Sequence, residues 1–155
     1  MTEITLEAAQ AKLSEVAEML AKLAKPLPAT LTLAIAAATI ELKPGEHYAG
    51  AVLDETTGLI KHHLVLMAEK PDERLNWQAA MDWAASVGGV LPTRQEQALL
   101  FANCKPHLDA DWHWSSQTHE SNSSYACHCY FGNGTQNYGG KSYAGCARAV
   151  RRVLP

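Results

Sequence analysis

The sequence has no apolar run long enough to cross a membrane and no large excess of either charge. Its longest apolar stretch, residues 27–40, contains three threonines and falls short of the about 20 residues that a spanning helix needs. Residues 1–4 lack the basic region and apolar core of a secretory signal. The formal net charge of −3 gives the chain no global attraction to phosphate backbones. We therefore expect a protein made in the cytosol that binds no nucleic acid and inserts into no membrane.

Cysteine is also scarce, and the metal-binding residue types are poorly spaced. Four cysteines occur in 155 residues, and without export we expect them as reduced thiols in or near the core. Cysteines and histidines gather within 107–146, but on a strand Cys127-His128-Cys129 would send its middle side chain to the opposite face. No Cys-x-x-Cys pair occurs, and Asp109 and Asp111 are too few for a calcium cage. The spacing predicts no metal and no cofactor.

Catalytic patterns are missing as well. The sequence contains no Ser-His-Asp order, no paired-carboxylate motif and no phosphate-binding loop. Cys127 and Cys129 would be the candidate nucleophiles, but a reactive thiol needs an electropositive, partly exposed setting. Both cysteines share a strand face with Phe131, which predicts burial and inertness. We therefore expect a protein that is not an enzyme.

The first 25 residues carry an apolar stripe. Between residues 5 and 24, apolar residues recur at alternating spacings of three and four, the a and d positions of a heptad. The contact residues of this stripe are Leu6, Leu13, Val16, Leu20 and Leu23. The pattern predicts that residues 1–25 form an amphipathic, coiled-coil-like helix for oligomerisation or docking, with a homotrimer favoured. The alternative is a helix that packs on its own domain.

A linker and a hairpin are expected next. Pro26 and Pro28 exclude a helix directly after the stripe, so residues 26–44 are predicted to be a linker with a strand at 31–35. The main domain then spans residues 45–155, beginning at the turn Lys43-Pro44-Gly45. Two strand-like runs, 48–53 and 61–67, flank a polar loop that ends in glycine, which is typical of a hairpin.

Two helices should follow the hairpin. Apolar residues on one face predict a first helix that ends at Gly88. Thr93 and Glu96 form a capping-box pattern, in which each side chain accepts from the backbone amide of the other residue, at the start of a second helix over 94–103. Beyond Pro106, short strand-like runs alternate with glycine-containing loops. This order predicts an α+β domain with its functional loops late in the chain.

The late part of the chain, residues 112–143, has the composition of a binding surface, because aromatic rings alternate with small polar residues. Alternation along 125–131 predicts two faces. The core face comprises Tyr125, Cys127, Cys129 and Phe131, and the displayed face comprises Ala126, His128 and Tyr130. The expected ligand-binding residues are His119, His128, Tyr130, Asn133, Thr135, Gln136, Asn137, Tyr138, Lys141 and Tyr143. Trp112 and Trp114 share one face of a strand and are interpreted as structural.

Four blocks of sequence occur in a characteristic order. They are Leu91-Pro92-Thr93-Arg94 with Glu96 and Leu99, Trp112 to Ser116, Tyr125-Ala126 to Phe131-Gly132, and Ala147 to Arg152. Together they resemble the Lcl C-terminal-like domain, a family common in bacterial and prophage proteins. The resemblance covers residues 45–153 and implies a C-type-lectin-like fold with two helices and a twisted antiparallel sheet. It also implies that ligand contacts come from the late strands and loops.

The resemblance and the composition lead to a functional expectation. We expect a non-enzymatic virion protein of a phage or prophage, of the tail-fibre or tail-tip adhesin type, made in the bacterial cytoplasm. Its partner would be a host-surface protein or glycan, bound by several copies at once. Two alternatives stay open: a structural virion component that contacts neighbouring tail or capsid subunits, and an intracellular module that blocks a host factor.

Overall fold

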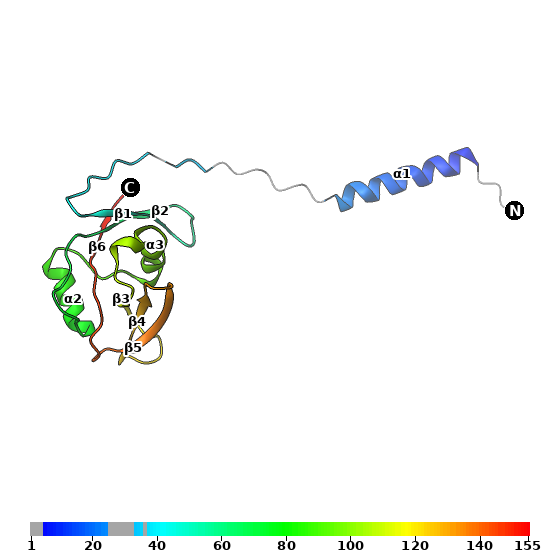
Figure 1. The fold of residues 1–155 in the computed structure, drawn as a ribbon. Helices are drawn as coiled ribbons and strands as arrows, with labels where there is room; N and C mark the ends of the chain where they lie inside the picture. The colour runs from blue at the N-terminus through cyan, green and yellow to red at the C-terminus, as the bar shows by residue number, and fades with distance from the viewer. Residues whose placement is uncertain (1–4, 25–32, 36) are drawn as a thin grey trace. The chain divides into compact units, whose positions relative to one another are not determined.

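The computed structural model describes residues 5–24, 33–35 and 37–155 (Figure 1). Contacts divide the chain into two compact units, residues 1–37 and 38–155. The elements of the described residues are α1 (Leu6–Leu23), β1 (His47–Leu53), β2 (Ile60–Leu66), α2 (Trp77–Ser86), α3 (Arg94–Cys104), the 3-10 helix η1 (Lys105–His107), β3 (Trp112–Thr118), β4 (Tyr125–Tyr130), β5 (Thr135–Gly140) and β6 (Val150–Val153). The predicted α+β class is confirmed.

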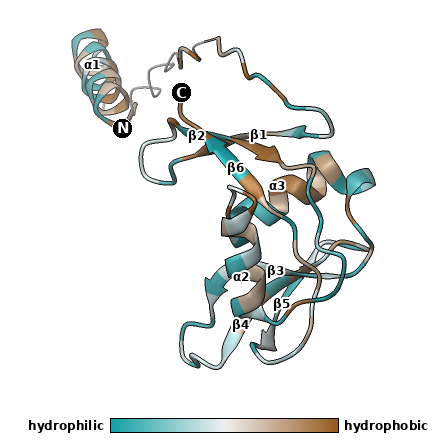
Figure 2. Ribbon diagram, turned by 90° about the vertical axis from the view of Figure 1, so that its left-hand side faces the viewer, coloured by the Kyte–Doolittle hydropathy of each residue, from teal (hydrophilic) through white to brown (hydrophobic). Residues whose placement is uncertain are grey.

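Helix α1 belongs to the first unit and has the predicted extent. Thr5 caps its N-terminus by accepting a hydrogen bond from the amide of Ala8. Hydrophobic and hydrophilic residues are interspersed along the helix (Figure 2), and none of its residues is buried. Within the described residues, no helix combines the length and the hydropathy that crossing a bilayer requires.

Only part of the predicted linker, residues 26–44, lies within the described residues. Leu31 and Thr32 lie outside the described residues, and the described part of the predicted strand, residues 33–35, is not a strand. The alanines that follow offer no alternating pattern that a sheet face could bury. The turn at Pro44 and Gly45 is present, with Gly45 at a φ of 79°.

Two three-stranded antiparallel sheets form the second unit. The first has the order β1-β2-β6 and the second the order β3-β4-β5. Helix α3 lies between them and contacts strands of both sheets (Figure 1). The predicted hairpin, both predicted helices and the strand-rich tail are therefore confirmed, although the tail contributes to two sheets and not to one.

Two hydrophobic clusters fill the interior. The first lies among β1, β2, α3 and β4 and contains Leu64, Leu100 and Phe131. The second joins α2 to β3 and β4 and contains Ala84, Trp114 and Ala126. The sheet β3-β4-β5 is consequently covered on both faces where these clusters meet it.

Buried carboxylates hold β6 in place through its arginines. The predicted capping box is present, because the Glu96 side chain accepts from the amide of Thr93 and the Thr93 side chain from the amide of Glu96. The same Glu96 carboxylate accepts two hydrogen bonds from Arg152, at 2.7 and 3.0 Å, and lies 2.8 Å from His62 Nε2. Glu46 forms a similar pair with Arg151. Both arginines of β6 are therefore paired with buried carboxylates.

The expected alternation along β4 is right for five residues and wrong for two. Cys127, Cys129 and Phe131 are buried, and His128 and Tyr130 are half-buried on the other face. Tyr125, the first residue of β4, is 42% exposed and lies outside the core. Ala126 is fully buried and not displayed, because α2 and Trp114 cover its face of the sheet.

Candidate functional site

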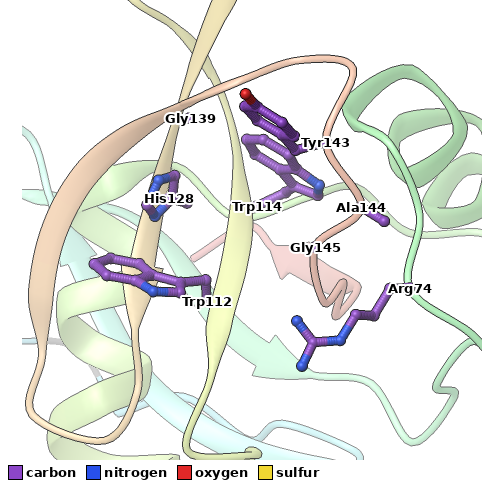
Figure 3. A pocket seen from close by; sticks show the side chains of 8 residues that line it. All are labelled: Arg74, Trp112, Trp114, His128, Gly139, Tyr143, Ala144 and Gly145. Carbon is purple, nitrogen blue, oxygen red and sulfur yellow. The ribbon is translucent and has the colours of Figure 1, made fainter.

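A cavity of about 320 Å³ opens beside the sheet β3-β4-β5 (Figure 3). Its walls come from three parts of the chain: the strands, the loop after β5 and the loop before α2. The lining residues are Arg74, Trp112, Trp114, His128, Gly139, Tyr143, Ala144 and Gly145. We call this cavity the aromatic pocket. Its size falls at the lower end of the range for small-ligand sites.

The strand register brings the rings of the aromatic pocket together. Trp112 pairs with Tyr130 and Trp114 pairs with His128 across β3 and β4, so all four side chains share one face. The His128 ring centroid lies 4.2 Å from that of Trp112 and 5.8 Å from that of Trp114, with nearly perpendicular planes. The Trp112 and Tyr130 centroids are 5.2 Å apart. These rings form a continuous row with edge-to-face and tilted contacts.

Two glycines leave the room that these rings occupy. A Cβ atom at Gly139 would lie 3.0 Å from Cδ2 of His128. A Cβ atom at Gly145 would lie 2.8 Å from Nε1 of Trp114, closer than side chains approach. The backbone at both positions therefore forms part of the pocket wall, and any side chain there would displace a ring.

Hydrogen bonds fix the wall opposite the sheet. Leu75 and Gly145 exchange two backbone hydrogen bonds of 2.9 Å, and the carbonyl of Leu75 also accepts from Nε1 of Trp114. At Lys141, four residues before Gly145, the backbone carbonyl accepts from the amide of Trp77, and the Lys141 ammonium lies 4.1 Å from the Trp77 ring centroid. The loop that carries Tyr143 is thus tied down at both ends, although Tyr143 itself is 71% exposed.

The aromatic pocket carries little charge. Burial lowers the pKa of His128 against a smaller opposing effect of the Tyr138 backbone carbonyl, which favours the neutral form of the imidazole. Arg74 is the only lining residue with a permanent charge, and its guanidinium pairs with Asp111. The site therefore offers apolar ring surface with one polar side, which suits a small group with an apolar face.

A second, smaller hollow holds two more of the predicted ligand-binding residues. His119 and Tyr138 line a cavity of about 180 Å³, with their ring centroids 4.2 Å apart. The guanidinium of Arg94 lies 5.9 Å from the Tyr138 centroid. Tyr138 pairs with Cys127 across the sheet and so lies on the face opposite to His128. The structure therefore divides the predicted binding surface between two faces.

The other predicted residues have separate positions. Thr135 and Asn137 pair with Tyr130 and His128, so they share the face of the aromatic row. Gln136 exchanges hydrogen bonds with Arg94 and ties β5 to the start of α3. Asn133 accepts from the amide of Thr135 inside the turn, and Lys141 lies over Trp77. Among the ten predicted residues, only His128 and Tyr143 line the aromatic pocket.

Sequence reasoning missed most of the pocket. Trp114 is buried and hydrogen-bonded, as the structural interpretation of the two tryptophans requires, but both tryptophans also line the cavity. Their shared face with His128 depends on the register between β3 and β4, which alternation within one strand does not give. Arg74 lies far earlier in the chain, and no sequence signal pointed to it.

The cysteines are free thiols, and three of the four are buried, as expected. Burial raises the pKa of Cys127 and of Cys129, which opposes nucleophilic reactivity. Cys146 is half-buried and lies close to Asp109 and His113. Within the described part of the chain, these three residues form the one group whose side chains could jointly hold a metal ion.

Comparison of the chain with protein-family models and with curated proteins found no match. The Lcl C-terminal-like assignment and the C-type-lectin-like fold therefore stay predictions from the sequence blocks.

Proposed function

We propose that this protein is a non-enzymatic binding protein of a phage or prophage virion, with a C-type-lectin-like domain of the Lcl C-terminal-like kind. Its domain would recognise a host-surface protein or glycan by enclosing one small group, such as a sugar ring or an apolar side chain. The observation that carries this proposal is the aromatic pocket, in which rings of β3 and β4 face a loop held by hydrogen bonds.

The chemistry of the pocket supports binding. Neutral rings contribute contact area without a desolvation penalty for buried charge. Tyr143 is exposed at the mouth and can close over an occupant, while Trp112 and His128 are held in place by the sheet. The affinity of one copy would be low, and the overall affinity would rise when several copies bind one surface. The apolar stripe of α1 would supply those copies.

The test is attachment of the fluorescently labelled full chain to a panel of bacterial strains. The wild-type protein should bind at least one strain, and Tyr143→Ala should weaken that binding about tenfold or more, since tyrosine is among the residues whose truncation costs a binding site most. Tyr125→Ala is the matched control, because Tyr125 is also exposed but lies outside the pocket. Melting temperatures of both variants should equal that of the wild type.

Equal attachment by the Tyr143→Ala variant and the wild-type protein would contradict the proposal that the aromatic pocket binds the ligand. Failure of the wild-type chain to bind any strain would contradict the adhesin role. In that case, incorporation of the protein into purified particles would support the structural alternative, and its absence from particles would support the intracellular one.

A further inference from the structure

Three different metal-binding side chains converge beside another hollow of the second unit. A carboxylate oxygen of Asp109, a ring nitrogen of His113 and the sulfur of Cys146 all lie within 4.8 Å of one another. Asp109 precedes β3, His113 belongs to β3, and Cys146 lies in the segment before β6. Asp109 and Cys146 are 37 positions apart in the sequence, so the three residues do not form a short sequence motif.

The backbone sets two of these side chains next to each other. His113 and Cys146 form a parallel bridge, in which the amide of Trp114 donates to the carbonyl of Cys146 at 3.0 Å. The amide of Cys146 in turn donates to the carbonyl of Trp112 at 2.9 Å. Residues paired in this way project to the same side of a sheet, so the imidazole and the thiol are neighbours by construction.

The His113 ring is already oriented as a metal ligand usually is. Its Nδ1 lies 3.0 Å from the backbone carbonyl oxygen of Asp111, and the side chain is buried. In histidine ligands, the ring N–H that does not bind the metal commonly donates a hydrogen bond to a carbonyl, which fixes both the tautomer and the ring plane. A carbonyl oxygen only accepts hydrogen bonds, so this contact places the ring proton on Nδ1 and the lone pair on Nε2.

The hollow beside this group gives access and an attractive charge. It has a volume of about 320 Å³, and Asp109 and Cys146 are part of its wall. Its charged lining residues are four acids, Asp72, Glu73, Asp109 and Asp111, and two bases, Lys70 and Arg74. The acidic excess favours a cation, and the opening provides the entry path that a metal site needs.

We propose that Asp109, His113 and Cys146 bind one Zn²⁺ ion and leave its fourth coordination position open toward this hollow. Carboxylate, imidazole and thiolate are all ligands that Zn²⁺ accepts, and three protein ligands with one open position is the arrangement of sites that exchange a bound group. The site is independent of the aromatic pocket, since only Arg74 lines both cavities.

One interaction competes with the ion. The ammonium of Lys70 forms an ion pair with Asp109, and about half of each side chain is exposed. An exposed pair of this kind contributes little free energy, so Lys70 can swing away when the metal arrives. Removing the ammonium should therefore strengthen metal binding, whereas removing a ligand should weaken it.

The experiment is calorimetric titration of the full, untagged chain with zinc chloride under reducing conditions. We expect one ion per chain, and at least tenfold weaker binding for each of Asp109→Asn, His113→Gln and Cys146→Ser. Asp72→Asn is the matched control from the same hollow and should bind as the wild type does, whereas Lys70→Met should bind more tightly. Far-ultraviolet circular dichroism shows whether each variant is folded; Asp109 is exposed, so its variant keeps the test decisive if His113→Gln unfolds.

Cobalt substitution identifies the thiolate ligand directly. Addition of Co²⁺ to the wild-type chain should produce a thiolate-to-cobalt charge-transfer band that is absent from Cys146→Ser. Lack of zinc binding by the wild-type protein would overturn the proposal. So would zinc binding that survives unchanged in the folded Asp109→Asn and Cys146→Ser variants, because the ion would then be held elsewhere.

Discussion

At the scale of single residues, Glu96 connects more of the fold than any other buried charge described above. It lies in α3, closes the capping box, and pairs with Arg152 of β6 and His62 of β2. Burial by itself would raise the pKa of Glu96, but the hydrogen bonds from Arg152 and the Thr93 amide, together with the charge of Arg152, hold it below its ordinary value. The carboxylate therefore stabilises the fold in its ionised form.

Replacement of this carboxylate should be costly. We expect Glu96→Gln to lower the free energy of unfolding by about 3 kcal/mol, the lower end for breaking a buried ion pair, since the Arg152 side chain is 37% exposed. Urea unfolding at neutral pH measures the difference. Glu55→Gln, in the exposed hairpin loop, is the control and should change stability by less than about 0.5 kcal/mol.

The same variant separates the pH dependence of this residue from that of the rest of the protein. A carboxylate with a lowered folded pKa contributes stability above its ordinary pKa of 4.5, and this contribution is lost as the pH falls through the folded value. The wild-type free energy of unfolding should therefore fall below about pH 4.5. Glu96→Gln should show a shallower fall, and an equally steep one would contradict the assigned role of the carboxylate.

At the scale of elements, α1 carries a stripe of exposed apolar side chains. In α1, the side chains of Leu6, Leu13 and Leu20 are each more than 60% exposed. A helix of 18 residues with such a stripe gains stability by pairing with other copies. We therefore retain the prediction that the full chain is an oligomer, with a trimer favoured.

This prediction can be tested with paired substitutions. Leu13→Asp with Leu20→Asp places two charges in the stripe and should convert the oligomer to a monomer in light scattering. Ala11→Asp with Ser14→Asp places the same two charges outside the stripe and should leave the oligomer intact. A wild-type chain that is monomeric at all concentrations tested would remove the multivalent part of the proposal.

Local sequence signals predicted the elements well, and long-range pairing explains what they missed. A helix cap or a tight turn depends only on residues that are close in the sequence. The boundaries set by the Thr93–Glu96 capping box, by Gly88 and by the loop before β2 therefore follow from the sequence. The aromatic pocket instead depends on the register that sets Trp114 opposite His128 and on a loop that brings Arg74 across from them. Neither relation has a local sequence signal.

The split of the predicted binding surface has the same origin. Alternation within one strand assigns side chains to faces but does not say what covers each face. Here α2 covers the face of the sheet that carries Ala126, while Tyr125 is 42% exposed on the other face. Glu96 was recognised only as a cap, since its pairing with Arg152 spans 56 positions of the chain.

At the scale of the whole molecule, the two units have complementary proposed roles. The first carries a helix whose apolar stripe suits self-association, and the second carries the aromatic pocket. Affinity at one pocket and the number of pockets per assembly then contribute separately to attachment. Loss of the stripe should reduce attachment to whole cells but leave the affinity of an isolated pocket for a soluble ligand unchanged.

The most direct measurement of the central claim is nuclear magnetic resonance of the backbone amides and tryptophan indole groups during titration with a soluble surface fragment from a strain that the protein binds. The aromatic pocket predicts large shifts of the Trp112 and Trp114 indole signals, with the Trp83 signal on α2 unchanged. Shifts confined to residues around His119 and Tyr138, with both pocket tryptophans unaffected, would contradict the account and place the ligand in the second hollow.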